Sequence, residues 1–217
     1  GIYPPDWEGY RYDDPVDVWV VGPSNQVVRD TLQKQYYLGD LEKGTQGLLH
    51  SSLIIDTQKA RGIADAVDTV YIRHVSGGVS KLTFKSYEQG REKFQGDKKH
   101  IIHIDEECPK PIYSECLIRT AATEKNFHGM IIVSMTPLKG KTELITHFTE
   151  DRPPETLQNS RWHVVATWDD NPYLSDEEKA RLKEGMSQHE MNARMNGVPW
   201  LGSGMVYPFV PQDITCK

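Results

Sequence analysis

Apolar runs that are separated by turn residues divide the first part of the chain into predicted strands and helices. Residues 17–22, 101–104 and 130–133 are short runs without regular polar alternation. This pattern is typical of strands that are buried on both faces of a parallel sheet. We therefore expect the second and third runs to be two inner strands of an α/β fold.

Helices are predicted where apolar residues recur at helical spacing. Pro23-Ser24-Asn25 supplies turn and N-cap chemistry for a helix through about Tyr37, with Val28, Leu32 and Tyr36 on one face. Residues 109–120 predict a shorter helix that turns Ile112, Cys116 and Leu117 inward. A strand followed by a helix is the unit from which α/β sheets are built.

Residues 69–74 and 81–86 differ from these runs because their side chains alternate and they flank Gly77-Gly78. That pattern predicts a β-hairpin. Beyond residue 150, the segment Asp151-Arg152-Pro153-Pro154 interrupts the chain, and residues 162–167 predict one more strand. We expect two domains, residues 1–150 and residues 151–217.

A helix is predicted in the second domain from Ser175 toward Ala193. Ser175 with Glu178 has the spacing of a capping box, and Gly197 with Pro199 is typical of a helix end.

Composition excludes several classes of protein. The 217 residues have ordinary apolar and charged fractions, and no apolar stretch approaches the ~20 residues of a membrane span. The three cysteines form no CxxC pair, so no zinc site or disulfide framework is implied. A net charge of −6 argues against a non-specific DNA clamp over the whole chain. Without an initiator methionine or targeting segment, both ends read as cut points in a longer protein.

The chemistry of the chain is expected where the two later runs end. Asp105-Glu106-Glu107 follows one run, and Ser134-Met135-Thr136 follows the other. Ligands bind at the carboxyl ends of parallel strands. An aspartate there can hold Mg²⁺ while the next glutamate activates water, as phosphoryl transfer requires. The alternatives are solvated or helix-capping carboxylates, and a metal-dependent nuclease centred on Asp105, Glu106 and Glu107.

A phosphate-binding loop is not found. Lys139-Gly140-Lys141-Thr142 ends like a Walker A motif, but the glycine required five residues before Gly140 is Met135. We interpret the tract as a helix start near Lys141. Since no other segment supplies a glycine-rich loop with lysine, the chain alone is not expected to bind ATP well. His100 and His103, near Asp105, are interpreted as edge or packed side chains, with metal ligation beside Asp105 as the alternative.

Several motifs in order resemble the large terminase subunit of tailed bacteriophages, the ATP-driven motor that packages DNA. The resemblance runs through segments 3–9, 19–24, 94–96, 104–107, 111–119, 134–140, 170–175, 193–194, 197–199 and 202–208. It implies a mostly parallel, twisted sheet of a P-loop (ASCE-type) ATPase between helices, with a β-hairpin and a small C-terminal linker subdomain. The Walker A residues would precede Gly1, and the nuclease residues would follow Lys217.

The resemblance also implies roles for residues of this chain. Asp105 would position Mg²⁺ on the phosphates of ATP, Glu106 would activate water, and Ser134, Met135 and Thr136 would couple hydrolysis to movement. The arginine finger is unassigned. Gln95 occupies the place of an arginine in some relatives, which leaves Arg91 and Arg119 as the candidates.

The expected function is the ATPase part of a viral DNA-packaging motor that moves double-stranded DNA into a prohead. The cofactors would be ATP and Mg²⁺. The partners would be DNA, the small terminase subunit, the portal protein and further copies of the chain, in the host cell cytoplasm and without a membrane. The alternative is a catalytically silent truncated fragment or interaction module, because the Walker A and nuclease residues are absent from the sequence.

Overall fold

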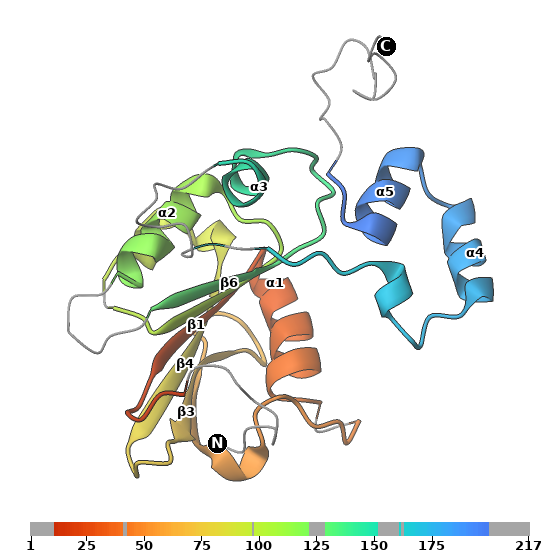
Figure 1. Cartoon of the computed structure of the whole chain (residues 1–217). Helices are drawn as coiled ribbons and strands as arrows, with labels where there is room; N and C mark the ends of the chain where they lie inside the picture. The colour runs from red at the N-terminus through yellow and green to blue at the C-terminus, as the bar shows by residue number, and fades with distance from the viewer. Residues whose placement is uncertain are drawn as a thin grey trace. The chain divides into compact units, whose positions relative to one another are not determined.

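The computed structural model describes residues 11–40, 43–96, 98–121, 129–151, 161 and 163–199. The chain divides into two compact units, Gly1–Ser134 and Met135–Lys217. The first unit holds the whole sheet, and the second holds short helices (Figure 1). The expected division at residue 150, between a partial ATPase core and the end of that core with a linker, stays a prediction.

The first unit is built on a six-stranded sheet with the order β2-β3-β4-β1-β5-β6. β4, β1, β5 and β6 run parallel, whereas β3 is antiparallel to both β2 and β4. The predicted α/β class and the predicted hairpin are both confirmed, and β2 is a strand that the sequence patterns did not predict. The strands are β1 (Asp17–Gly22), β2 (Ile54–Lys59), β3 (Val67–Arg73), β4 (Val79–Ser86), β5 (Ile101–Asp105) and β6 (Met130–Ser134).

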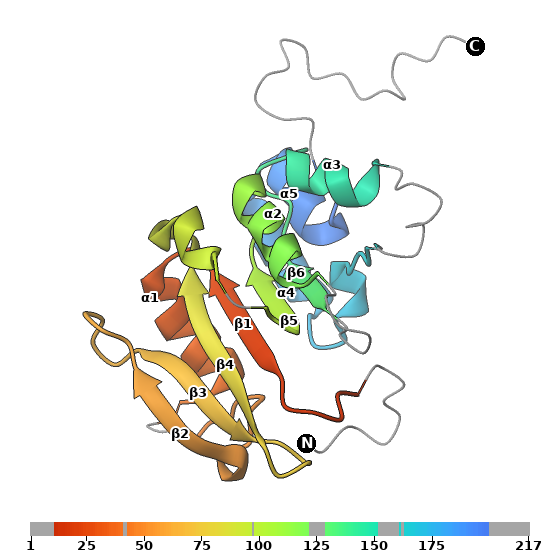
Figure 2. The ribbon, with the colours of Figure 1, turned by 90° about the vertical axis from the view of Figure 1, so that its left-hand side faces the viewer.

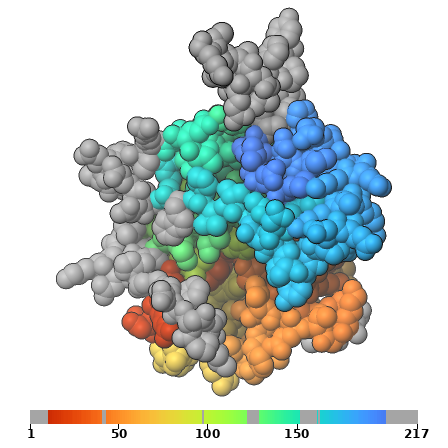
Figure 3. Space-filling model, turned by 45° about the vertical axis from the view of Figure 1, so that its right-hand side comes forward, coloured from red at the N-terminus to blue at the C-terminus, as the bar shows by residue number. Residues whose placement is uncertain are grey.

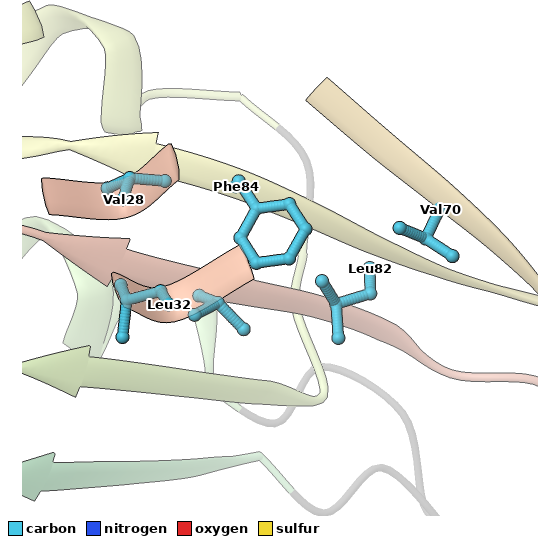
Figure 4. Close-up of a cluster of buried hydrophobic side chains, with 6 residues drawn as sticks. Val28, Leu32, Val70, Leu82 and Phe84 are labelled. Atoms are coloured by element: carbon cyan, nitrogen blue, oxygen red, sulfur yellow. The ribbon is translucent and has the colours of Figure 1, made fainter. Parts of the chain in front are cut away.

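Helices cover both faces of the sheet. The helix formed by α1 (Asn25–Val27) and η1 (Val28–Tyr37) lies on one face, and α2 (Lys110–Arg119) lies on the other (Figures 1 and 2). Shorter 3₁₀ turns are η2 (Ser51–Leu53), η3 (Tyr87–Gln89) and η4 (Arg91–Phe94). On the η1 side, a buried apolar cluster joins helix to sheet and comprises Val20, Val28, Leu32, Val70, Leu82 and Phe84 (Figure 4).

The helix after β1 differs from the predicted α-helix in its hydrogen bonding. η1 is a π-helix, with bonds such as that from the Leu38 N–H to the Gln33 carbonyl at 2.7 Å. The i→i+5 bonds widen each turn, so the buried face no longer follows α-helical spacing. Val28 and Leu32 are buried as predicted, but Tyr36 is exposed and Tyr37 packs against the cluster instead.

Two further burial predictions are wrong. β6 was expected to be an inner strand, but among the described residues it forms one edge of the sheet, and Met130 and Ile132 are exposed. β5 is an inner strand whose residues Ile102 and Ile104 are fully buried. Leu117 is exposed because α2 buries the face that carries Ile112, Tyr113, Glu115 and Cys116.

The second unit contains α3 (Glu143–Thr149), η6 (Trp168–Asp170), α4 (Asp176–Glu184) and α5 (Gln188–Asn196). The start of α3 agrees with the predicted helix start, with Thr142 as its N-cap. Residues 163–167 form no strand, and Trp162 lies outside the described residues. A strand requires a hydrogen-bonded neighbour, and none is present among the described residues.

The single predicted helix from Ser175 to Ala193 is two helices. Ser175 caps α4 as predicted, but α4 ends at Glu184 and Ser187 caps a new helix, α5. α4 has no buried residue, and its side chains lie at the surface in Figure 3. Apolar packing therefore does not hold α4 and α5 as one continuous helix. Gly197 ends α5 in the left-handed conformation, with φ 62°, as predicted.

Candidate functional site

The carboxyl ends of the four parallel strands, β4, β1, β5 and β6, lie together at one end of the sheet. Asp105, the last residue of β5, is in register with Ser134, the last residue of β6. Gly22 at the end of β1 is likewise in register with Ser86 at the end of β4. Because residues in register point to the same face, the Asp105 and Ser134 side chains lie next to each other. The two predicted strand ends are therefore adjacent.

The three consecutive carboxylates have three different environments. Asp105 is half-buried, Glu106 is exposed and Glu107 is buried. Glu106 has a φ of 63°, a left-handed backbone conformation that is uncommon for a residue other than glycine. β5 ends at Asp105, so Asp105 and Glu107 do not share one strand face as a regular continuation would have required. The exposed carboxylate is the one directly after the half-buried aspartate.

Backbone hydrogen bonds stabilise the turn that carries Glu106. The Glu106 N–H donates to the Ser134 carbonyl at 2.7 Å. The Tyr87 hydroxyl lies 2.9 Å from the Glu106 carbonyl and also contacts the Asp105 carbonyl. Burial raises the pKa of Tyr87, and nearby Cys108 and Asp105 add to this effect, so the hydroxyl remains a donor. Uncommon backbone conformations persist only where surrounding contacts hold them. β6 and Tyr87 supply those contacts here.

A chain of hydrogen bonds, the polar relay, joins η1 to the Asp105 carboxylate and consists of Tyr37, His103, Ser134 and Asp105. The Tyr37 hydroxyl lies 2.8 Å from His103 Nδ1. His103 Nε2 lies 2.8 Å from Ser134 Oγ, and Ser134 Oγ lies 3.0 Å from Asp105 Oδ1. His103 and Asp105 are two residues apart on β5 and point to the face that η1 covers.

The direction of each hydrogen bond follows from the chemistry of its groups. An ionised carboxylate accepts only, so the single proton of the Ser134 hydroxyl is donated to Asp105. His103 Nε2 must then donate to Ser134 Oγ, and His103 Nδ1 accepts from Tyr37. All donors of the polar relay therefore point toward the carboxylate.

Burial has opposite effects on the two ring-bearing members of the polar relay. It lowers the pKa of His103, although the Asp105 charge partly opposes this effect. It raises the pKa of Tyr37 to about 12, and the Asp105 charge adds to this effect. Both directions favour a neutral imidazole and a protonated phenol at neutral pH. These are the protonation states that the polar relay requires.

The ends of β1 and β4 are joined by a second polar cluster. The Asn25 N–H donates to a Glu88 carboxylate oxygen at 2.8 Å. The Ser86 hydroxyl and the Gln89 amide both donate to Asn25 Oδ1, at 2.8 and 3.2 Å. These bonds attach the start of the helix on one face to the segment that follows β4.

The two candidate arginine fingers are both paired with one carboxylate on α2. Arg91 Nε lies 2.9 Å from Glu115 Oε2, and Arg119 Nη2 lies 3.6 Å from Glu115 Oε1. Arg119 also donates to the Gly96 carbonyl. The Arg119 carbonyl accepts from the N–H of Lys99, which lies just before the start of β5. Arg119 therefore lies near the amino end of β5, whereas Asp105 is at its carboxyl end. Both arginines attach the segment before β5 to α2.

The remaining predicted site residues lie in the second unit. Met135 and Thr136 are its first residues and are half-buried. Thr142 caps α3 by accepting from the Ile145 N–H, and Lys141 pairs with Glu150. The Lys-Gly-Lys-Thr tract therefore leads into a helix start, as predicted.

The carboxylates do not form a multi-ligand metal cluster. Within the described ranges, no group of at least three His, Cys, Asp or Glu side chains is placed to hold a metal ion. The nuclease alternative was centred on Asp105, Glu106 and Glu107, of which Glu107 is buried and Glu106 is exposed. One carboxylate with substrate phosphates and water is the usual Mg²⁺ site of nucleotide enzymes. The donor set fits that arrangement.

Sequence reasoning did not find Tyr37 or Tyr87, and it interpreted His103 as a packed side chain. A tyrosine is an ordinary core residue in an apolar pattern, so no local signal marked either hydroxyl. The alternation of His103 with Asp105 along one strand was the signal available for the histidine, because both residues had to share a face.

Comparison with known proteins places these observations in a family. Residues 12–210 match the family model described as terminase large subunit, T4likevirus-type, N-terminal. The large terminase subunit of Salmonella phage P22 is 32% identical over the whole chain, and that of Enterobacteria phage LP7 is 30% identical over 56% of it. The chain spans 43% of the P22 protein and 24% of the LP7 protein.

The fold has a solved counterpart. The large terminase of the thermophilic bacteriophage D6E, determined in complex with ADP, aligns with a TM-score of 0.51 and 12% identity. The alignment covers 85% of this chain and 40% of the D6E chain. No helix in the described part of the chain is long and apolar enough to cross a membrane.

Proposed function

Because the chain belongs to the terminase large subunit family, we propose that it forms part of the ATPase of a viral DNA-packaging motor. The motor would couple ATP hydrolysis to movement of double-stranded DNA into a prohead. The observation that carries the proposal is the pair of strand ends, where Asp105 accepts from Ser134 and the exposed Glu106 follows. The ADP in the D6E structure supports a nucleotide as the ligand.

The proposed roles follow from the environments of the carboxylates. Asp105, which is half-buried and oriented by Ser134, would hold Mg²⁺ together with nucleotide phosphates. When bound, Mg²⁺ would neutralise charge on the transferred phosphoryl group. Glu106 is exposed and would orient and deprotonate the attacking water. Glu107 is buried, which removes it from contact with solvent.

Ser134 is the last residue before the second unit. Its side chain donates to Asp105, its carbonyl accepts from Glu106, and Met135 and Thr136 continue directly into the second unit. We propose that Ser134, Met135 and Thr136 report the state of the nucleotide to the following helices. The pairing of Arg91 and Arg119 with Glu115 favours a structural role for both arginines in the free chain.

The partners of the proposed motor are double-stranded DNA, the small terminase subunit, the portal protein and further copies of the chain, in the host cytoplasm. Lys99, which precedes β5, is a poor DNA contact because it is buried against Trp19 and pairs with Asp17 at 3.7 Å. With a net charge of −6, any contact with phosphates must come from local basic patches.

The test of the ATPase proposal uses the chain extended by the residues encoded upstream of Gly1. We expect ATPase activity that Glu106→Gln abolishes and that Glu184→Gln, a matched change of an exposed residue on α4, leaves unchanged. Unchanged turnover in Glu106→Gln would remove this residue as the catalyst.

The alternative function, a catalytically silent interaction module, is tested on the 217-residue chain itself. Calorimetric titration with ATP and Mg²⁺ should show no micromolar binding, because no glycine-rich loop with lysine is present in the sequence. Absence of activity in the extended chain as well would favour the silent module. Micromolar binding to the 217-residue chain would contradict the proposed need for upstream residues.

A further inference from the structure

His103 lies between η1 and the Asp105 carboxylate, and the proposed mechanism assigns it no role. Its Nδ1 faces the Tyr37 hydroxyl and its Nε2 faces Ser134 Oγ, both at 2.8 Å. A neutral imidazole has one N–H donor and one acceptor nitrogen, and each nitrogen of this ring has a partner. The two partners come from η1 and from β6, 66 and 31 residues away in sequence.

The Ser134 hydroxyl is the point at which the ring affects the carboxylate. A serine hydroxyl rotates freely about its C–O bond unless its lone pairs and its proton are both engaged. Here the proton is donated to Asp105 at 3.0 Å, and the oxygen accepts from His103. If the ring did not donate, the hydroxyl would be able to turn toward water, since Ser134 is exposed.

We propose that His103 is a positioning residue for Asp105, which it orients by donating from Nε2 to the Ser134 hydroxyl. Tyr37 fixes the tautomer of His103, because its hydroxyl donates to Nδ1 and keeps the ring proton on Nε2. The Tyr37 ring also contacts the His103 ring and so restricts its position. Tyr37 is itself packed edge-on against Phe84. The consequence for catalysis rests on the function proposed above, but the positioning itself does not.

The position of η1 in the fold explains why Tyr37 reaches the ring. The wide turns of the π-helix place Tyr37 on the face that Tyr36 would occupy in an α-helix. Two backbone bonds hold this end of the helix, in which the Leu48 and Leu49 N–H groups donate to the carbonyls of Tyr36 and Tyr37. π-helical segments are frequent at functional sites, and this one supplies the outermost donor of the polar relay.

The first measurement needs no substitution. Long-range ¹H–¹⁵N NMR of the 217-residue chain at about pH 7 should show His103 as the tautomer with a protonated Nε2 and an unprotonated Nδ1. His103→Gln identifies the His103 signals among those of the eight histidines. The opposite tautomer, or an even mixture of the two, would overturn the proposal.

The second measurement uses two histidine substitutions that retain different parts of the ring's hydrogen bonding. A glutamine amide reaches the position of Nε2 and donates to Ser134, whereas an asparagine amide reaches only the position of Nδ1. Three-bond couplings of the Asp105 β-protons should show one side-chain rotamer in the wild type and in His103→Gln. They should show rotamer averaging in His103→Asn and in Ser134→Ala.

Ser114→Ala is the matched control, because Ser114 is an exposed serine on α2. It should leave both the tautomer and the Asp105 rotamer unchanged. A single Asp105 rotamer in all variants, His103→Asn included, would show that the ring does not position the carboxylate.

The catalytic consequence is measured in the upstream-extended chain. We expect His103→Asn to lower kcat about tenfold with a smaller change in the KM for ATP, and His103→Gln to recover most of that loss. Equal rates in the two variants would overturn the catalytic consequence. If the extended chain has no ATPase activity while Asp105 order still depends on His103, the proposed function fails and the positioning role is supported.

Discussion

Replacing Glu115 by glutamine removes the charge that holds both candidate arginine fingers, without changing the size of the side chain. The Glu115 side chain is 5% exposed, and it pairs with Arg91 at 2.9 Å and with Arg119 at 3.6 Å. Breaking a buried ion pair from one side costs about 3–5 kcal/mol, because the remaining charge is left without its partner. The Arg91 side chain is 58% exposed, so water recovers part of its solvation. We therefore expect a loss of about 2–3 kcal/mol in the free energy of unfolding.

The assay is urea unfolding followed through NMR signals of α2 and β5, which report on the first unit alone. Arg119→Gln should cost about 1–2 kcal/mol, since its side chain is 20% exposed, and Arg91→Gln less than about 1 kcal/mol. A double-mutant cycle between Glu115 and Arg119 isolates their interaction. A Glu115→Gln loss below about 0.5 kcal/mol would refute the structural assignment and leave both arginines as candidate fingers.

Three further outcomes follow from burial, backbone conformation and titration. Leu32→Ala, at a fully buried position of the cluster between η1 and the sheet, should lower the free energy of unfolding by about 2–5 kcal/mol in urea. Gly197→Ala should destabilise α5 by about 1–2 kcal/mol, seen as faster amide exchange there, because φ is 62° and a Cβ would lie 2.6 Å from Val165. The pKa of His103 is lowered in the fold, so the unfolded chain binds more protons just below about pH 6.5, and stability falls as pH decreases through that window. That fall should be shallower in His103→Gln, and equal slopes would contradict the lowered pKa.

Much of the fold was predictable because the information is local. The apolar runs identified β1, β5 and β6, and the alternating segments around Gly77-Gly78 identified the β3–β4 hairpin. The strand predicted at residues 162–167 failed for the opposite reason, because a strand depends on a hydrogen-bonded neighbour that the local sequence does not specify. The single helix predicted after Ser175 failed because helical spacing does not show which face finds a packing partner.

The sequence by itself determined that Asp105 and Ser134 would meet, since the carboxyl ends of neighbouring parallel strands share one edge of the sheet. Only the tertiary structure decided which carboxylates are exposed, which partner Arg91 and Arg119 take, and that Tyr37 reaches His103. These contacts join residues that are far apart in the chain, and they depend on the turn width of η1 and the packing of α2. Local sequence patterns do not indicate the turn width of η1 or the packing of α2, because packing between elements decides which side chains become partners.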